Sequence, residues 1–167
     1  RCAYSRADAL TVALALPADL DPVPSDALAR GIAPPSGRDV WHEDPAGFRH
    51  GPALRWFPSG QLRSVTPYRH GVRQGRYRAW FANGSVELEG LFDNDEPTGT
   101  WRRWYDTGQP MMTIDLVDGV LHGPARNCYP TGAQARVWAY DAGFQHGLDQ
   151  TWLMDGSLFS EERLERG

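Results

Sequence analysis

Lysine is absent from this sequence, and all 17 basic residues are arginine. Its absence excludes chemistry that needs a lysine amine, such as Schiff-base catalysis or the phosphate contact of a P-loop. Cysteine is scarce, because only Cys2 and Cys128 are present, so a framework of several disulfides is excluded. The longest apolar run, Leu10 to Leu16, is far shorter than the roughly 20 residues of a membrane-spanning helix. We therefore expect no transmembrane segment.

Motifs for catalysis and metal binding are missing as well. The sequence has no GxSxG nucleophile motif, no glycine-rich phosphate loop, and no HxxxH or CxxC spacing. The stretch from His42 to Asp44, close to His50, is the best metal candidate, but it lacks a recognised ligand spacing. We expect no enzymatic activity, no cofactor and no metal.

The charge and the two cysteines bear on partners and location. The net charge of −4 argues against nucleic acid as a partner. Cys2 lies next to the start of the sequence, as in a processed lipoprotein, although Arg1 is the wrong residue before a lipidated cysteine. A disulfide between Cys2 and Cys128 and two free thiols are the alternatives. We expect the bacterial cell envelope, periplasmic or lipid-anchored through Cys2, in preference to the cytoplasm.

What the sequence does contain is glycine at a fixed period of 24 residues. The first series is Gly51, Gly75, Gly99, Gly123 and Gly147, and the second is Gly60, Gly84, Gly108, Gly132 and Gly156. A third series of X-Gly pairs includes His70-Gly71 and is interrupted once, by Asn94-Asp95. A fixed period of this length indicates a repeat architecture, whose units are too small to fold alone.

The glycine pairs predict β-hairpins. An X-Gly pair between apolar stretches is a strong hairpin signal, because such turns need positive φ angles that glycine adopts easily. We predict that Ser59-Gly60 and its equivalents are two-residue loops, and that His70-Gly71 and its equivalents are the turns at the other end. A glycine or proline every few residues disfavours helix.

A two-residue loop at Ser59-Gly60 fixes which residues face each other. Away from the loops the predicted pairs are Tyr77–Gly90, Arg78–Glu89, Trp101–Ile114 and Ala125–Trp138. Next to the loops they are Phe57–Leu62, Phe81–Val86 and Leu153–Leu158. Large residues opposite small ones favour this register, because a slip by one residue would move every side chain to the other face.

The predicted fold is all-β: an elongated, twisted antiparallel sheet, an open solenoid of about five 24-residue hairpins with an N-terminal cap. We assign residues 1–47 to the cap and residues 48–167 to the array. Within the cap, we expect a strand at Leu10–Leu16 and an irregular proline-rich arm over residues 17–38.

The units resemble MORN-type repeats, as the stretches Gly75–Gly84, Gly99–Gly108 and Leu116–Gly123 show best. They are most similar to a bacterial branch described as antitoxins of toxin–antitoxin systems. The resemblance implies hairpins in an extended sheet, binding to proteins or membrane lipids, and no catalytic residues. The sequence departs from the pattern at Cys128, where the other units have tryptophan, and at Asp149 and Glu162, where they have apolar residues.

Two sets of recurring residues are candidates for binding. They are Trp56, Trp80, Trp104 and Trp152, and, on the same face of the predicted strands, Arg78, Arg102 and Arg126. The tryptophans suit either a stacked core or a partly open aromatic groove. The arginines suit either pairing with acids such as Glu89 or contact with an anionic partner.

These observations favour a non-enzymatic module for protein–protein interaction, an antitoxin-like protein or an envelope-associated scaffold. The alternative is a surface module of the cell envelope that binds lipid or glycan.

Overall fold

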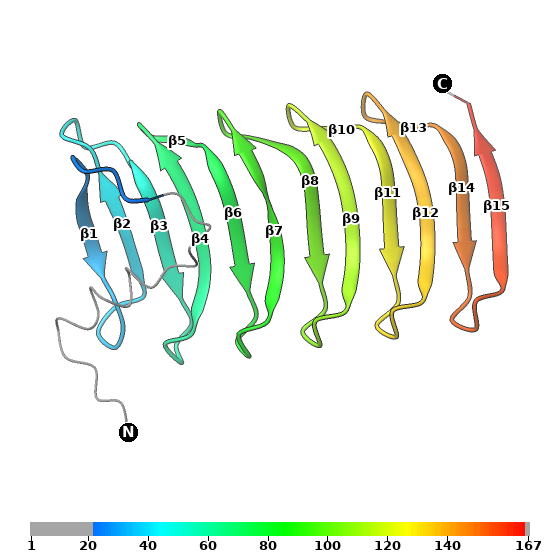
Figure 1. The fold of residues 1–167 in the computed structure, drawn as a ribbon, viewed down its shortest axis with the longest axis horizontal. Coiled ribbons are helices and arrows are strands. Elements are labelled where there is room, and N and C mark those ends of the chain that lie inside the picture. The colour runs from blue at the N-terminus through cyan, green and yellow to red at the C-terminus, as the bar shows by residue number, and fades with distance from the viewer. Residues whose placement is uncertain (1–21, 166–167) are drawn as a thin grey trace.

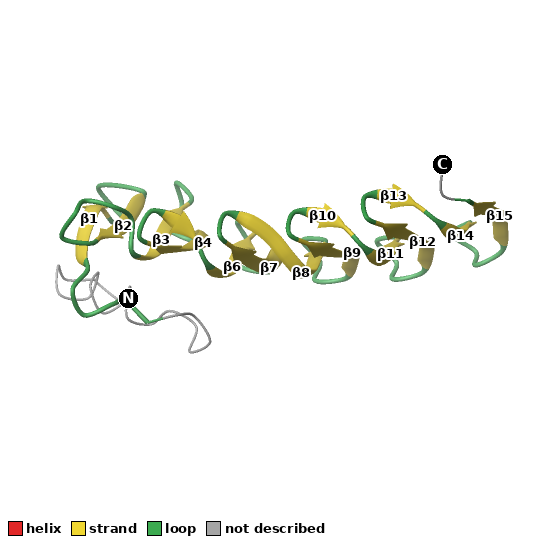
Figure 2. Cartoon of the chain, turned by 90° about the horizontal axis from the view of Figure 1, so that it is seen from above, coloured by secondary structure: helices red, strands yellow, loops and turns green. Residues whose placement is uncertain are grey.

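The computed structural model describes residues 22–165, and all the regular structure in this part of the chain is β. The strands form one antiparallel sheet of 15 strands that follow one another in chain order (Figure 1). Seen from above, the strands lie in a single extended layer (Figure 2). The predicted all-β, elongated hairpin-repeat fold is confirmed.

The strands fall into two groups. The long ones are β1 (Leu28–Ile32), β2 (Asp39–Glu43), β3 (Gly51–Trp56), β4 (Leu62–Arg69), β6 (Gly75–Trp80), β7 (Val86–Asp93), β8 (Glu96–Trp104), β9 (Pro110–Val117), β11 (Gly123–Cys128), β12 (Gln134–Asp141), β14 (Gly147–Trp152) and β15 (Leu158–Leu164). Three short ones, β5 (Val72–Arg73), β10 (Val120–Leu121) and β13 (Phe144–Gln145), each pair with the strand before them. Within the described residues, no helix is long and apolar enough to cross a membrane.

The hairpin loops at the second glycine series contain three residues, not two. The Phe57 N–H donates to the Gln61 carbonyl at 2.9 Å, and the Gly60 N–H donates to the Phe57 carbonyl at 2.9 Å. Gly60 has a φ of 86°, which is the left-handed conformation that ends a three-residue hairpin loop. The same bonds recur at Gly84, Gly108, Gly132 and Gly156.

This loop overturns the pairs predicted next to it. A bulge shifts the register there, so Trp56, and not Phe57, pairs with Leu62. In the same way Trp80, not Phe81, pairs with Val86, and Trp152, not Leu153, pairs with Leu158. Away from the loops the predicted register is confirmed, including Tyr77–Gly90, Arg78–Glu89, Trp101–Ile114 and Ala125–Trp138.

The turns at the other end of the hairpins are the tight ones. His70 and Gly71 have φ angles of 48° and 88°, and they join Arg69 to Val72, which are paired residues. The Gly71 N–H also donates to the Arg49 carbonyl of the preceding unit at 2.7 Å. The equivalent bonds run from Asp95 to Arg73, from Gly119 to Pro97 and from Gly143 to Leu121. Each turn is therefore fixed to the unit before it.

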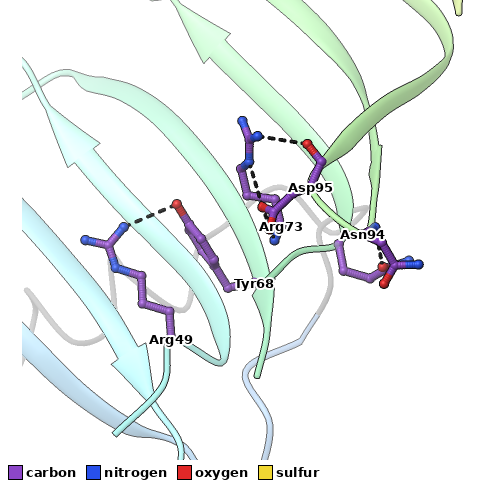
Figure 3. A network of polar contacts seen from close by, with 6 residues as sticks. Arg49, Tyr68, Arg73, Asn94 and Asp95 are labelled. Atoms are coloured by element: carbon purple, nitrogen blue, oxygen red, sulfur yellow. Dashed lines mark hydrogen bonds and ion pairs between the residues drawn. The ribbon is translucent and has the colours of Figure 1, made fainter. Parts of the chain in front are cut away.

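Asp95, which replaces a glycine of the third series, is held in its left-handed conformation by Arg73 (Figure 3). The Arg73 backbone N–H and Nε donate to its carboxylate at 2.9 and 3.0 Å, and Arg73 Nη2 donates to its carbonyl at 2.8 Å. These bonds lower the pKa of the Asp95 carboxyl. The side chain therefore provides a link between units that glycine cannot make.

The first strands extend the sheet at its N-terminal end. β1 pairs with β2, and β2 pairs with β3. The prediction of an irregular arm over residues 17–38 was wrong for Leu28–Ile32, because the nine residues between Pro24 and Pro34 leave room for a strand. The expected strand at Leu10–Leu16 and the role of Cys2, including its pairing with Cys128, lie outside the described residues. Cys128 itself is half-buried and forms no disulfide within residues 22–165.

Candidate binding face

One face of the sheet carries two parallel rows of side chains, which together we name the Trp–Arg face. The Arg row consists of residues that pair across successive strands from β2 to β15. They are, in order, Val40, Leu54, Val65, Arg78, Glu89, Arg102, Thr113, Arg126, Val137, Gln150 and Glu161. The three predicted arginines therefore lie in one line across the array.

The Trp row lies beside the Arg row, next to the three-residue loops. Its members are Trp56, Leu62, Trp80, Val86, Trp104, Pro110, Cys128, Gln134, Trp152 and Leu158. Trp56 and Trp80 pack with Leu54 and Val65 of the Arg row. Trp104 lines a hollow with Glu89 of the Arg row. These contacts place both rows on the same face, as the sequence predicted for the tryptophans and arginines.

The tryptophans of this face differ in burial along the array. Trp56 and Trp80 are 7% and 8% exposed and belong to the main hydrophobic cluster. Ala33 and Val40, from the N-terminal strands and their connection, pack against the same cluster. Trp104 and Trp152 are only half-buried. The Trp row is thus a core at one end, and at the other it is a more accessible stripe that is apolar except at Gln134.

The three arginines also differ in their surroundings. Arg78 Nη2 lies 3.1 Å from Glu89 Oε2, and both side chains are largely buried, with 16% and 25% exposed. Arg102 and Arg126 are exposed. Within residues 22–165 neither of them forms a salt bridge or a side-chain hydrogen bond. Their guanidinium groups are therefore free to bind an anion.

Shallow hollows adjoin the two exposed arginines. One lies over Arg102, Leu91 and Thr100, and another over Arg126, Thr113 and Val137. Thr113 stands between the two arginines because it pairs with Arg102 on one side and Arg126 on the other. Sequence reasoning missed Thr113, although the pairing between hairpins repeats with the same 24-residue step as the pairing within them.

The N-terminal arm lies on the same face. Pro22 and Pro24 line a hollow of about 540 Å³ together with Pro52, Val65 and Pro67. A Cβ added to Gly51 would lie 2.9 Å from Pro24 Cδ, so the arm is in close contact with the sheet. A proline-containing segment of this chain therefore packs on this side of the sheet, next to Val65 of the Arg row and away from the Trp row.

Several arginines of the opposite face are paired with acids. Arg55 Nε lies 2.7 Å from Asp39 Oδ1, and Arg103 Nη2 lies 3.0 Å from Glu87 Oε1. Asp149, one of the departures from the repeat pattern, accepts hydrogen bonds from Arg136. These bonds lower the pKa of the Asp149 carboxyl.

Aromatic rings fill the middle of the opposite face around Gly90. The Trp101 ring covers this glycine so closely that an added Cβ would lie 2.2 Å from it. Tyr77 stacks with Trp101 at a centroid distance of 5.8 Å, and Phe92 meets Trp101 edge-on at 5.2 Å. Burial raises the pKa of the Tyr77 hydroxyl. This face is therefore closed by its own side chains around Gly90.

Asp44, His50 and His70 form a further cluster, in which each residue has a possible ligand atom within 4.8 Å of the others. His70 Nδ1 lies 2.7 Å from Asp44 Oδ2, and this bond lowers the pKa of the Asp44 carboxyl. The two imidazole rings are stacked, with centroids 4.2 Å apart and planes inclined by 28°. Because ligand lone pairs lie in the ring plane, stacked rings do not point at one ion. The backbone N–H of His70 also donates to His50 Nδ1 at 3.2 Å, so the His50 imidazole holds the turn at His70.

Comparison with known proteins finds a similarity for the first two units of the array. A family model described as MORN repeat variant matches residues 49–70 and 73–94. None of the curated proteins is similar enough to this chain to count as a match. MORN repeats are non-enzymatic modules that generally mediate interactions with proteins or membranes. In two of its five units this chain is therefore similar to the MORN repeat variant family.

Proposed function

We propose that the array is a non-enzymatic module that docks a partner protein on its Trp–Arg face. The partner is a toxin, in an antitoxin-like complex, or another component of the bacterial cell envelope. One contrast carries the proposal. Among residues 22–165, Arg102, which lies beside the half-buried Trp104, and Arg126 have no ion-pair partner, whereas Arg55 and Arg103 on the opposite face are paired.

The chemistry of the face suits a protein partner better than a small ligand. Its hollows are shallow and spread over several strands, and interfaces between proteins are enriched in tryptophan and arginine. Exposed guanidinium groups next to an apolar stripe offer both charge-assisted hydrogen bonds and contact area. Trp56 and Trp80 are buried at the N-terminal end of the same face, and they contribute by stabilising the sheet that presents these groups.

The proposal is tested by pull-down from a lysate of the source organism, with the intact protein and with two variants as bait. The test variant is the double substitution Arg102→Gln and Arg126→Gln, and the matched control is Arg103→Gln, one residue along the chain on the opposite face. We expect the wild-type protein and the control to retain the same specific protein, and the double variant to lose it. Capture of the same proteins by all three would contradict the proposal.

A parallel measurement covers the alternative of lipid or glycan. The same three proteins are sedimented with anionic liposomes and with isolated cell-wall material at low salt. Sedimentation that depends on Arg102 and Arg126, without capture of a specific protein, would replace the proposed function with surface binding.

A further inference from the structure

We propose that the partner docks through a segment in the polyproline II conformation with an acidic residue at every third position. The segment runs along the array, across the strands, over the Trp–Arg face. This inference rests on the proposed function and specifies the chemistry of the docked segment.

The spacing of the arginines carries the inference. Arg78, Arg102 and Arg126 lie on every second strand of the Arg row. One strand lies between each pair, and it carries Glu89 in the first case and Thr113 in the second. Neighbouring strands are about 4.8 Å apart, so the arginine positions repeat at about 9.6 Å. A polyproline II helix has three residues per turn and rises about 3.1 Å per residue, so it repeats at about 9.3 Å. The two repeats agree to within about 0.3 Å per turn, which a flexible arginine side chain accommodates.

Other conformations of a bound segment fit less well. Side chains on one side of a β-strand repeat at about 6.7 Å, which misses the arginine spacing from the first step. Side chains seven residues apart on an α-helix are separated by about 10.5 Å, so their mismatch is about three times larger.

The distance between the Arg row and the Trp row suits a helix with three residues per turn. Arg102 and Trp104 are two residues apart on β8, so the Arg row and the Trp row are about 7 Å apart. One residue of each turn then contacts the Trp row, the next reaches the Arg row, and the third faces solvent. Proline suits the first position beside Trp104, because aromatic-lined grooves are the usual docking sites of polyproline II segments. Beside Arg126 the Trp row has Cys128 in place of a tryptophan. Aspartate or glutamate suits the second position, because a carboxylate accepts two bonds from a guanidinium.

The charges of the Trp–Arg face determine how many turns of the bound segment can place an acidic residue on an arginine. Arg78 already bonds Glu89, so the acidic residues fall at Arg102 and Arg126, over two consecutive turns. Thr113 places a hydroxyl between these two positions. Asp115 lines the same hollow as Arg126, where it accepts a hydrogen bond from Thr100 Oγ1 at 2.6 Å. This carboxylate disfavours a third acid beyond the Arg row.

The chain itself shows that prolines can pack on this face. Pro22 and Pro24 lie against Pro52 and Pro67 at the N-terminal end of the sheet. Pro52 and Pro67 are two residues from Leu54 and Val65 of the Arg row, on the side away from the Trp row.

The test compares three fluorescently labelled peptides by anisotropy with the wild-type protein. The first is (Pro-Glu-Ala)4. The second has the same composition, but its glutamates are alternately two and four residues apart. The third is (Pro-Arg-Ala)4. We expect the first peptide to bind at least tenfold more tightly than the second, and the third not to bind. The preference should disappear in the Arg102→Gln, Arg126→Gln double variant and persist in the Arg103→Gln control.

Two outcomes would overturn the inference. Equal binding of the two acidic peptides would show that charge alone attracts them, and no binding of the first peptide would exclude the polyproline II segment. Neither outcome affects the proposed function, which depends on selective capture of a partner protein. The comparison of the two acidic peptides uses the wild-type protein, so it remains valid even if a variant fails to fold.

Discussion

The hairpins that contain Trp56 and Trp80 differ from those that contain Trp104 and Trp152, although all follow the same 24-residue pattern. In the first pair the tryptophans are buried with Leu54 and Val65. In the later hairpins the Arg row has Arg102, Thr113, Arg126 and Gln150 at the positions equivalent to these two aliphatic residues. One position in the repeat thus serves as core at one end and as accessible surface at the other.

The C-terminal hairpin has the most exposed apolar residues of the later hairpins. Its exposed apolar residues are Leu148, Leu153, Met154, Leu158 and Phe159. β15 is the last strand of the described sheet, so one of its edges has no neighbouring strand there. Glu161 and Glu162 on this strand oppose pairing with a second copy, because like charges would meet across an antiparallel edge. Stability is therefore concentrated in the first hairpins.

The largest expected effect comes from removing equivalent tryptophans at the two ends. Trp80→Ala removes a buried ring and should lower the free energy of unfolding by about 3–5 kcal/mol. Trp152→Ala removes a half-buried ring at the same repeat position and should cost less than half as much. Urea denaturation followed by tryptophan fluorescence or circular dichroism measures both. Equal losses would show that burial does not separate the two ends.

An intermediate effect on stability is expected on the opposite face, where the Trp101 ring covers Gly90. Gly90→Ala places a methyl group against the Trp101 ring and should cost about 1–3 kcal/mol through overpacking. In a Trp101→Ala background the same change should be nearly neutral, because the ring it would meet is gone. A double-mutant cycle measures this coupling. Additive effects would mean that the close packing does not constrain Gly90.

The smallest expected effect is a gain in the second half of the array. Ala142 has a φ of 49°, in the left-handed region that alanine adopts at a cost. Asn94 occupies the equivalent turn position with the same φ of 49°. Ala142→Asn should therefore stabilise the protein by about 0.5–1 kcal/mol, since asparagine tolerates this conformation better. Asn94→Ala is the reciprocal control and should lose a similar amount; a loss in both variants would contradict the explanation.

Most of the fold follows from the period and from cross-strand pairing. The glycine series, with Asn94-Asp95 as the one exception, located the turns of the array, and the pairs Tyr77–Gly90 and Ala125–Trp138 fixed the register. The loop at Ser59-Gly60 was wrong by one residue, because an X-Gly pair suits either a two-residue loop or the end of a three-residue loop. The hydrogen bond from Gly60 to Phe57 decides between them only in three dimensions.

The candidate site was only partly accessible from the sequence. Alternation along a strand placed Arg78 and Trp80 on one face, and the repeat carried this to the later units. The burial of Trp80 depends on its neighbours across the sheet, among them Val65, which the order of residues does not show. His70 was missed for the same reason, since it is 26 residues from Asp44, which it bonds.

The bonds between successive turns restrict how this chain can change in length. Each tight turn donates its backbone N–H to a carbonyl of the unit before it, as Gly71 does to Arg49. An insertion or deletion within a unit displaces that donor from its acceptor, and it also shifts the acceptor that the next turn uses, since each unit bonds only to its neighbours. Gain or loss of a whole unit preserves the ladder, and it moves the boundary between the buried and accessible tryptophans by one hairpin. Variation among relatives of this protein should therefore occur in steps of 24 residues, and each step would lengthen or shorten the surface offered to a partner.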